Sequence, residues 1–186
     1  MNIADSLTLL RLALVPFFLW RFLVGDYELA FILFVIAGLT DLVDGTIARV
    51  LKQQTRFGAL LDPIADKALM VTTFACLLYL RIVPWWFFAL LAIRDVAILS
   101  GLAYLQCKKI KVELKPVYAS KLATLTNIFL VIFGFLQFFY PAHIFLMRSF
   151  LFWFEATLAL ATTLVLLSAI QYFWIGVKIL RRRKML

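Results

Sequence analysis

Long apolar stretches recur along this chain, and they constrain its fold more than any other feature. A membrane-spanning helix needs about 20 mainly apolar residues, because each residue adds only about 1.5 Å to its length. Hydrophobic residues make up 65% of the 186, whereas a soluble domain has roughly half. Six segments meet the requirement: residues 6–24, 28–50, 59–80, 84–106, 118–140 and 150–178. The sequence therefore predicts an all-α polytopic membrane protein with six transmembrane helices, in a single domain over residues 1–186.

The charged residues between these segments set the expected orientation. Basic residues gather after the second and fourth spans and in the tail: Arg49, Lys52, Arg56, Lys108, Lys109, Lys111, Lys115, Lys178, Arg181, Arg182, Arg183 and Lys184. The opposite connections hold only Arg21, Arg81 and Arg148. Because short cytoplasmic loops are enriched in Lys and Arg, we expect both termini to be cytoplasmic. The first apolar run lacks a small-residue cleavage site, so we expect a span there rather than a signal peptide.

The formal net charge of +9 should therefore lie mostly on the cytoplasmic surface. Clustered basic residues at a membrane surface attract anionic lipid head groups. Nucleic acid is a poor alternative partner, because no soluble module is present to read a groove. Cys76 and Cys107 show no pair spacing typical of a metal knuckle or a disulfide framework, which predicts free thiols.

Four aspartates are unusual for a membrane protein, because a carboxylate inside a bilayer is costly and normally faces a polar cavity. Asp41 and Asp44 lie near the end of the second span, and Asp62 and Asp66 near the start of the third. Each pair is three or four residues apart, so its members share a helix face. Asp44 and Asp62 centre on residue 53, and Asp41 and Asp66 on 53.5. An antiparallel hairpin would therefore bring all four carboxylates to one place.

Carboxylates that close together require a cation. Mg²⁺ prefers oxygen ligands and is often shared between carboxylates and substrate phosphates. Two such ions can hold both the attacking and the leaving oxygen of a phosphoryl centre. No Cys or His lies nearby in the sequence, which argues against zinc or copper.

Small residues follow the first aspartate pair. Gly45 removes a side chain beside Asp44, Ala48 is small, and Arg49 offers a guanidinium to phosphate. Gly58 lies on the other arm of the hairpin. The pattern predicts a slot for a flat group. Close packing between membrane helices is an alternative explanation for both glycines.

These residues resemble the signature of the CDP-alcohol phosphotransferase family, also called CDP-alcohol phosphatidyltransferases. That signature reads Asp-x-x-Asp-Gly-x-x-Ala-Arg, eight residues, Gly, three residues, Asp, three residues, Asp. Every spacing is intact at Asp41, Asp44, Gly45, Ala48, Arg49, Gly58, Asp62 and Asp66. The six-span layout agrees with the family as well, so the resemblance extends over essentially the whole chain.

The resemblance implies specific roles and partners. The four aspartates would hold Mg²⁺ or Mn²⁺, with two ions expected, and Asp66 would also act as general base. The CDP group of CDP-diacylglycerol would lie against Asp44, Gly45, Ala48, Arg49, Gly58 and Thr8. An acceptor hydroxyl would attack the phosphorus attached to the lipid and release CMP; a phosphatidyl-enzyme formed on an aspartate is an alternative. The family also implies a homodimer in a bacterial-type inner membrane, with the active site facing the cytoplasm.

The N-terminus follows the family pattern only in part. Relatives often begin Pro-Asn-x-Leu-Thr-x-x-x-Arg or with Arg one residue earlier, and here Thr8 and Arg11 fit, three residues apart on one face. Asp5 replaces the usual Asn. An added carboxylate is unfavourable near a diphosphate, so we leave Asp5 out of the expected site.

Four basic residues are candidates for binding the acceptor or its phosphate: Arg11, Arg94, Lys115 and Lys121. Two alternatives stay open for them. Arg94 could instead pair with Asp95 or another buried acid. The lysines could instead serve only as the cytoplasmic positive charges that set the membrane topology.

Two kinds of family member match best. Phosphatidylglycerophosphate synthases resemble the stretch from Thr55 to Lys67, but they carry a second arginine where this chain has Leu102. The cardiolipin synthases that use a CDP-lipid resemble three runs here: 37–41, 94–96 and 114–124. We therefore favour phosphatidylglycerol as acceptor and cardiolipin as product, with glycerol-3-phosphate as the alternative acceptor.

A transporter or proton channel is the competing class of function. Acids that line a transport pathway would be spread over several depths and spans. Here the four aspartates belong to one hairpin and accompany a nucleotide-compatible glycine pattern. A lipid-binding scaffold without catalysis would not need the complete metal-binding set. Both alternatives are therefore disfavoured.

Overall fold

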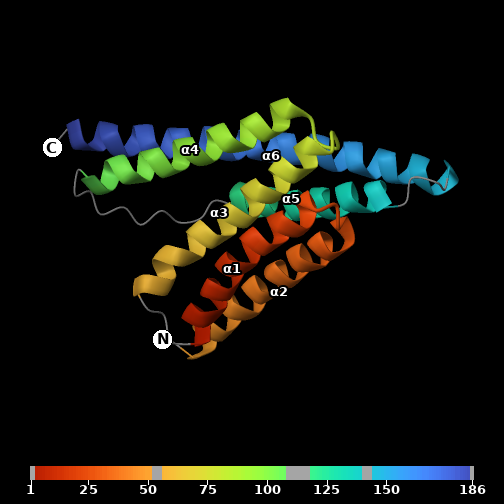
Figure 1. The fold of residues 1–186 in the computed structure, drawn as a ribbon. Helices are drawn as coiled ribbons and strands as arrows, with labels where there is room; N and C mark the ends of the chain where they lie inside the picture. Colours follow the sequence, from red (N-terminus) through yellow and green to blue (C-terminus); the bar gives the residue numbers. More distant parts are fainter. Residues whose placement is uncertain (1–2, 52–55, 108–117, 140–143, 185–186) are drawn as a thin grey trace. The chain divides into compact units, whose positions relative to one another are not determined.

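The computed structural model describes residues 3–51, 56–107, 118–139 and 144–184, and within them every element is a helix. Side chains are described for residues 8–40, 64–101, 118–139 and 151–178. The helices in chain order are α1 (Ile3–Leu23), α2 (Tyr27–Leu51), α3 (Arg56–Tyr79), α4 (Trp85–Cys107), α5 (Tyr118–Phe139) and α6 (Ile144–Lys184) (Figure 1). The predicted all-α fold with six helices is confirmed for this part of the chain.

The helix boundaries agree with the apolar segments to within a few residues, except in α6. That helix runs from Ile144 to Lys184, beyond both ends of the predicted segment 150–178. Lys and Arg are good helix formers, so the basic tail continues the helix after the apolar residues stop. Apolar composition marks where a helix can meet lipid and not where the helix itself ends.

Within the described residues, two helical stretches are long and apolar enough to cross a membrane. They are α5, over Tyr118–Phe139, and the stretch Leu151–Lys178 of α6. A shorter apolar helical stretch, Tyr27–Thr40, lies in α2. The count of six spans and the cytoplasmic position of the termini stay predictions.

The contacts divide the chain into two compact units, Met1–Leu80 and Arg81–Leu186. Unit 1 contains α1, α2 and α3, and unit 2 contains α4, α5 and α6. Each unit is described by itself below. The assignment of the whole chain to one functional domain stays a prediction.

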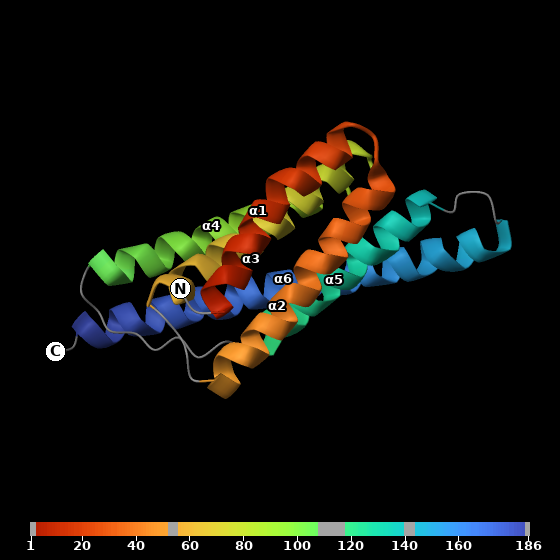
Figure 2. The same cartoon turned by 60° about the horizontal axis from the view of Figure 1, so that its bottom comes forward.

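In unit 1, α1 packs against both α2 and α3, while α2 and α3 contact each other only briefly (Figures 1 and 2). The turn between α1 and α2 depends on Gly25, whose φ of 89° lies in a region that residues with a Cβ rarely adopt. Asp26 then caps the N-terminus of α2, because its Oδ1 accepts a hydrogen bond from the Leu29 backbone N–H at 3.2 Å. This tight reversal makes α1 and α2 antiparallel neighbours.

The core of unit 1 combines large and small residues. Phe18 is fully buried and Phe22 nearly so, and both lie on α1. On α2, Ala30 and Ala37 are fully buried and seven residues apart, which places them on one face. Small residues at such a face let two helix backbones approach closely. Large buried side chains on α1 and small buried residues on α2 therefore both contribute to the core of unit 1.

In unit 2, α6 packs along α5 and also against α4 (Figure 2). Its fully buried apolar residues come from all three helices: Phe87 of α4, Leu130, Val131 and Phe135 of α5, and Ala161 and Val165 of α6. Branched and aromatic side chains there alternate with the small residues Gly134 and Ala161. The pairing of α5 and α6 thus forms the body of the unit, and α4 is added to it along α6.

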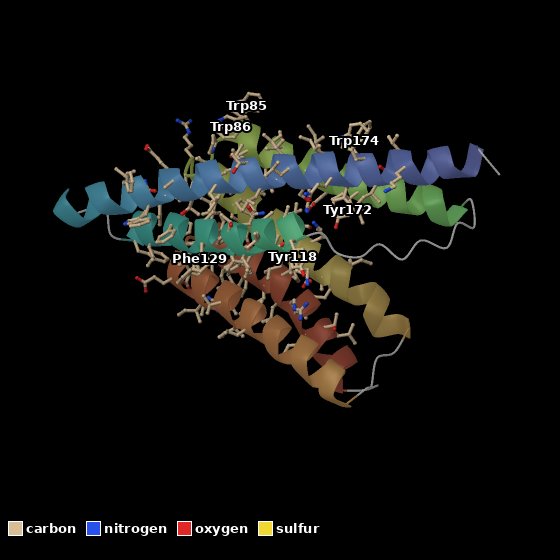
Figure 3. All side chains as sticks on the ribbon, turned by 180° about the vertical axis from the view of Figure 1, so that it is seen from behind. Trp85, Trp86, Tyr118, Phe129, Tyr172 and Trp174 are labelled. Carbon is tan, nitrogen blue, oxygen red and sulfur yellow. The ribbon has the colours of Figure 1, made fainter. Side chains whose placement is uncertain are left out.

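Large aromatic side chains point outward from unit 2. Trp85 and Trp86 stand at the start of α4, and Trp174 projects from the later part of α6 (Figure 3). Trp85 is 73% exposed and Trp174 62% exposed. Trp and Tyr with this exposure are typical of the zones where a membrane meets water. The arrangement agrees with the expectation that lipid, rather than water, surrounds these helices.

Candidate active site

An ion pair joins α1 to α3 in unit 1. The Arg11 Nη1 atom donates a hydrogen bond to Asp66 Oδ1 at 2.5 Å. The Arg11 side chain is only 1% exposed, whereas the Asp66 side chain is 48% exposed. The carboxylate therefore faces outward from a guanidinium that lies beneath it.

Thr8 lies one turn before Arg11 on α1, and it is 1% exposed. The spacing of three residues places both polar side chains on one face of the helix, as the sequence predicted. Arg11 was expected to bind the acceptor or its phosphate. In the structure its guanidinium is buried and contacts Asp66, and its expected role in binding the acceptor stays a prediction.

The backbone places the other signature residues at the same end of unit 1. Asp41 lies ten residues before the end of α2 at Leu51, and Asp66 lies ten residues after the start of α3 at Arg56. At 1.5 Å per residue, each is about 15 Å from the helix end nearest the α2–α3 connection. The depth match predicted from the residue numbers therefore agrees with the helix boundaries.

Several predicted site residues have side chains outside the part that the structure describes. Asp41, Asp44, Gly45, Ala48 and Arg49 lie in α2, and Gly58 and Asp62 lie in α3, while Lys115 lies outside the described residues altogether. Whether the four carboxylates converge stays a prediction. Among the side chains that are described, no three His, Cys, Asp or Glu residues gather into a group.

The donor set nevertheless fits a hard divalent cation. The one described member, Asp66, presents a half-exposed carboxylate, and the other three predicted ligands are also aspartates. An all-oxygen set suits Mg²⁺ or Mn²⁺. Arg11 contacts Asp66 through the Oδ1 atom.

A second buried polar cluster lies in unit 2 around Arg94 of α4, which is 9% exposed. Arg94 Nη1 donates to Asp95 Oδ1 at 2.7 Å. Arg94 Nη2 donates to Ser120 Oγ on α5 at 2.7 Å and to Ser168 Oγ on α6 at 2.9 Å. The alternative that Arg94 pairs with Asp95 is thus confirmed, and one guanidinium links three helices.

Sequence reasoning missed the two serines as partners of Arg94. Ser168 is the one hydroxyl in the run Leu166-Leu167-Ser168-Ala169-Ile170, and it is fully buried. A lone hydroxyl in an apolar helix is a usable signal, because it needs a partner when buried. Lys121, next to Ser120, is exposed and does not join the cluster through any hydrogen bond in the described part of unit 2.

A comparison with protein families identifies the chain. The model of the CDP-alcohol phosphatidyltransferase family matches residues 1–161, which include the whole aspartate signature and Arg94. The chain belongs to this family. CDP-alcohol phosphatidyltransferases are membrane-bound transferases that generally use divalent metals, so the resemblance inferred from the sequence is confirmed.

Individual relatives carry two kinds of name. A Drosophila melanogaster protein named "Probable cardiolipin synthase (CMP-forming)" is 39% identical over 102 residues, 54% of this chain and 32% of the relative. A Mycobacterium tuberculosis protein named "Probable phosphatidylglycerophosphate synthase" is 39% identical over 103 residues, 52% of this chain and 49% of the relative. A Haemophilus influenzae protein named "CDP-diacylglycerol--glycerol-3-phosphate 3-phosphatidyltransferase" is 49% identical over 73 residues, 38% of this chain and 40% of the relative.

These matches span between about a third and a half of each relative's length. The names differ in the acceptor, because one kind makes cardiolipin and the other makes phosphatidylglycerophosphate. Family membership is therefore established. The names of the relatives do not decide which of two alcohols this family member uses as acceptor.

Proposed function

We propose that this chain is a phosphatidyltransferase that uses CDP-diacylglycerol, with phosphatidylglycerol as favoured acceptor and cardiolipin as product. The complete eight-residue signature on α2 and α3 carries the proposal. The ion pair between Arg11 and Asp66 supports it, because it holds the last signature carboxylate at the outward face of unit 1.

The proposed chemistry assigns each residue a task. Asp66 accepts the proton of the acceptor hydroxyl as its oxygen attacks the phosphorus that carries diacylglycerol. The new P–O bond forms as the bond to the CMP phosphate oxygen breaks, so CMP leaves. Arg11 keeps the Asp66 carboxylate in one orientation from below. Magnesium or manganese ions held by Asp41, Asp44, Asp62 and Asp66 would neutralise the diphosphate charge.

The nucleotide would lie against the later part of α2 and the start of α3. In this proposal Asp44, Gly45, Ala48, Arg49 and Gly58 contact the CDP group, with Thr8 of α1 beside it. Gly45 and Ala48 leave room for a flat base, and Arg49 offers donors to phosphate. Thr8 is buried one turn from Arg11, so its hydroxyl lies close to the residue that holds Asp66.

The acceptor is proposed to meet basic residues of α4, of α5 and of the segment between them. Arg94 and Lys121 belong to α4 and α5, and Lys115 lies outside the described residues. An anionic acceptor needs such cations. Glycerol-3-phosphate is the second candidate acceptor, and it is favoured by the Haemophilus relative, which is named for that reaction.

We further propose six membrane spans with both termini and the active site on the cytoplasmic side, in a single functional domain. The outward aromatic residues of α4 and α6 support a lipid environment. A homodimer in a bacterial-type inner membrane follows from the family resemblance. In this setting the donor and the favoured acceptor are both lipids of the same leaflet.

The test is CMP release by the detergent-purified full chain given CDP-diacylglycerol and Mg²⁺ or Mn²⁺. Phosphatidylglycerol and glycerol-3-phosphate are offered in parallel. Asp66→Asn should abolish release. Asp26→Asn, the same chemical change at the α1–α2 turn, should retain it, because Asn also caps a helix.

The outcomes separate the candidates. Release with phosphatidylglycerol alone supports cardiolipin synthesis. Release with glycerol-3-phosphate alone contradicts it and supports phosphatidylglycerophosphate synthesis instead. Folded protein that releases no CMP with either acceptor would contradict both acceptor assignments.

A further inference from the structure

Arg94 is held by side chains from its own helix and from two others. Its guanidinium donates to Asp95 of α4, Ser120 of α5 and Ser168 of α6, at 2.7, 2.7 and 2.9 Å. Ser168 is fully buried and Arg94 is 9% exposed. Hydrogen bonds from a charged donor are stronger in such apolar surroundings than in water. The orientation of this guanidinium is therefore set by the protein.

A count of donors shows what remains available. A guanidinium carries five N–H groups. Nη2 uses both of its hydrogens on the two serines, and Nη1 uses one on Asp95, which leaves one hydrogen on Nη1 and the one on Nε. Arg94 Nε is buried, and it has no hydrogen-bond partner within the part of the chain that the structure describes. A buried donor without a partner is unfavourable, and an anionic oxygen is the strongest partner it can gain.

We propose that Ser120 and Ser168 are positioning residues that orient Arg94 so that Nε binds a phosphate oxygen of the acceptor. Because the guanidinium is planar, two bonds at Nη2 and one at Nη1 fix its plane and hence the direction of the Nε–H group. This inference rests on the proposed function. The chemistry is common to both candidate acceptors, since phosphatidylglycerol carries a phosphodiester and glycerol-3-phosphate a phosphomonoester.

A purely structural role is the competing explanation for the same contacts. A tether between α4, α5 and α6 would lower stability when removed and would affect the acceptor no more than the donor lipid. A positioning role acts on one substrate. The Michaelis constant for the acceptor, compared with that for CDP-diacylglycerol and with kcat, therefore distinguishes the two.

The experiment measures steady-state CMP release by the full chain and its Ser168→Ala and Ser120→Ala variants. We expect KM for the active acceptor to rise about threefold to tenfold in each, because a hydrogen bond to a charged group is lost. We expect kcat and KM for CDP-diacylglycerol to stay within about twofold. Ser120→Thr keeps the hydroxyl at a half-buried position and should restore the acceptor KM.

Ser100→Ala is the matched control. The Ser100 hydroxyl donates to the Ala97 carbonyl of its own helix at 3.1 Å and is exposed, so its loss should leave every constant unchanged. If Ser168→Ala does not fold, the Ser120→Ala and Ser120→Thr pair decides. An unchanged acceptor KM in Ser120→Ala, or an equal loss in Ser120→Thr, overturns the proposal. Failure of the unmodified chain to release CMP would instead contradict the proposed function itself.

Discussion

Arg11 lies beneath Asp66, with Nη1 of the arginine 2.5 Å from Oδ1 of the aspartate. The arginine is 1% exposed and the aspartate 48% exposed, so the pair is buried on one side only. Removing one partner of such a pair weakens the charge compensation of the other, which costs more when the remaining charge is buried than when it is exposed. This asymmetry leads to the first prediction.

Asp66→Asn should destabilise unit 1 by about 1–3 kcal/mol, because the buried guanidinium loses its charge-assisted hydrogen bond to this carboxylate. Arg11→Gln combined with Asp66→Asn should recover part of that loss. Apparent melting temperatures in detergent would measure both effects. The exposed pair Arg21 and Asp26, 3.7 Å apart, is the control, and neutralising it should change stability by less than about 1 kcal/mol. A double variant no more stable than Asp66→Asn would contradict the prediction.

Removal of divalent metal should stop CMP release. A chelator would withdraw the ions that we propose for the four aspartates, and added Mg²⁺ or Mn²⁺ should restore activity. Ca²⁺ should restore little, because it prefers longer bonds and more ligands. The measurement is CMP release against free metal concentration. Full activity in excess chelator would refute the metal assignment, and Asp41→Asn, Asp44→Asn and Asp62→Asn should each raise the metal concentration required.

Gly45 and Gly38 lie on the same helix and predict opposite responses to the same change. Gly45→Ala should raise KM for CDP-diacylglycerol about tenfold, because the added methyl would enter the space proposed for the nucleotide. Gly38→Ala should leave it unchanged, since a Cβ at residue 38 meets nothing within 4 Å. Steady-state kinetics with varied CDP-diacylglycerol would compare the two. Equal effects would argue that Gly45 serves helix packing rather than nucleotide binding.

The proposed orientation predicts which thiols a membrane-impermeant reagent reaches. In a background that lacks Cys76 and Cys107, Asp26→Cys at the α1–α2 turn should react in intact cells. Lys184→Cys at the end of α6 should react only after the membrane is opened. Labelling of both positions from outside would mean an even number of spans between them, and the reverse pattern would invert the topology.

Much of the candidate site could be predicted from sequence, because its residues are local. The spacing of Asp41, Asp44, Asp62 and Asp66 follows helix periodicity, and their depth match follows from counting residues away from one hairpin. The helix boundaries agree with that count. The relative depth of residues on two consecutive helices can be predicted without knowing the rest of the fold. Side-chain convergence at three of these positions stays a prediction.

The partners of the two buried arginines were beyond the reach of sequence. Arg11 and Asp66 are 55 residues apart, and Arg94 and Ser168 are 74 apart. No periodicity relates positions that far along the chain, and several acids and hydroxyls were available to each arginine. Because a buried guanidinium needs hydrogen-bond acceptors, each arginine pairs with the acceptors that helix packing brings next to it.

The sequence alone thus determined the helical class, the helix positions and the family signature, because apolar length and local spacing express all three directly. Only the tertiary structure decided that Arg11 holds Asp66 and that Arg94 reaches serines on α5 and α6. The physical reason is that side-chain partners depend on which helix faces meet. That is settled by the packing of α1 against α2 and α3 in unit 1, and of α6 along α5 and α4 in unit 2.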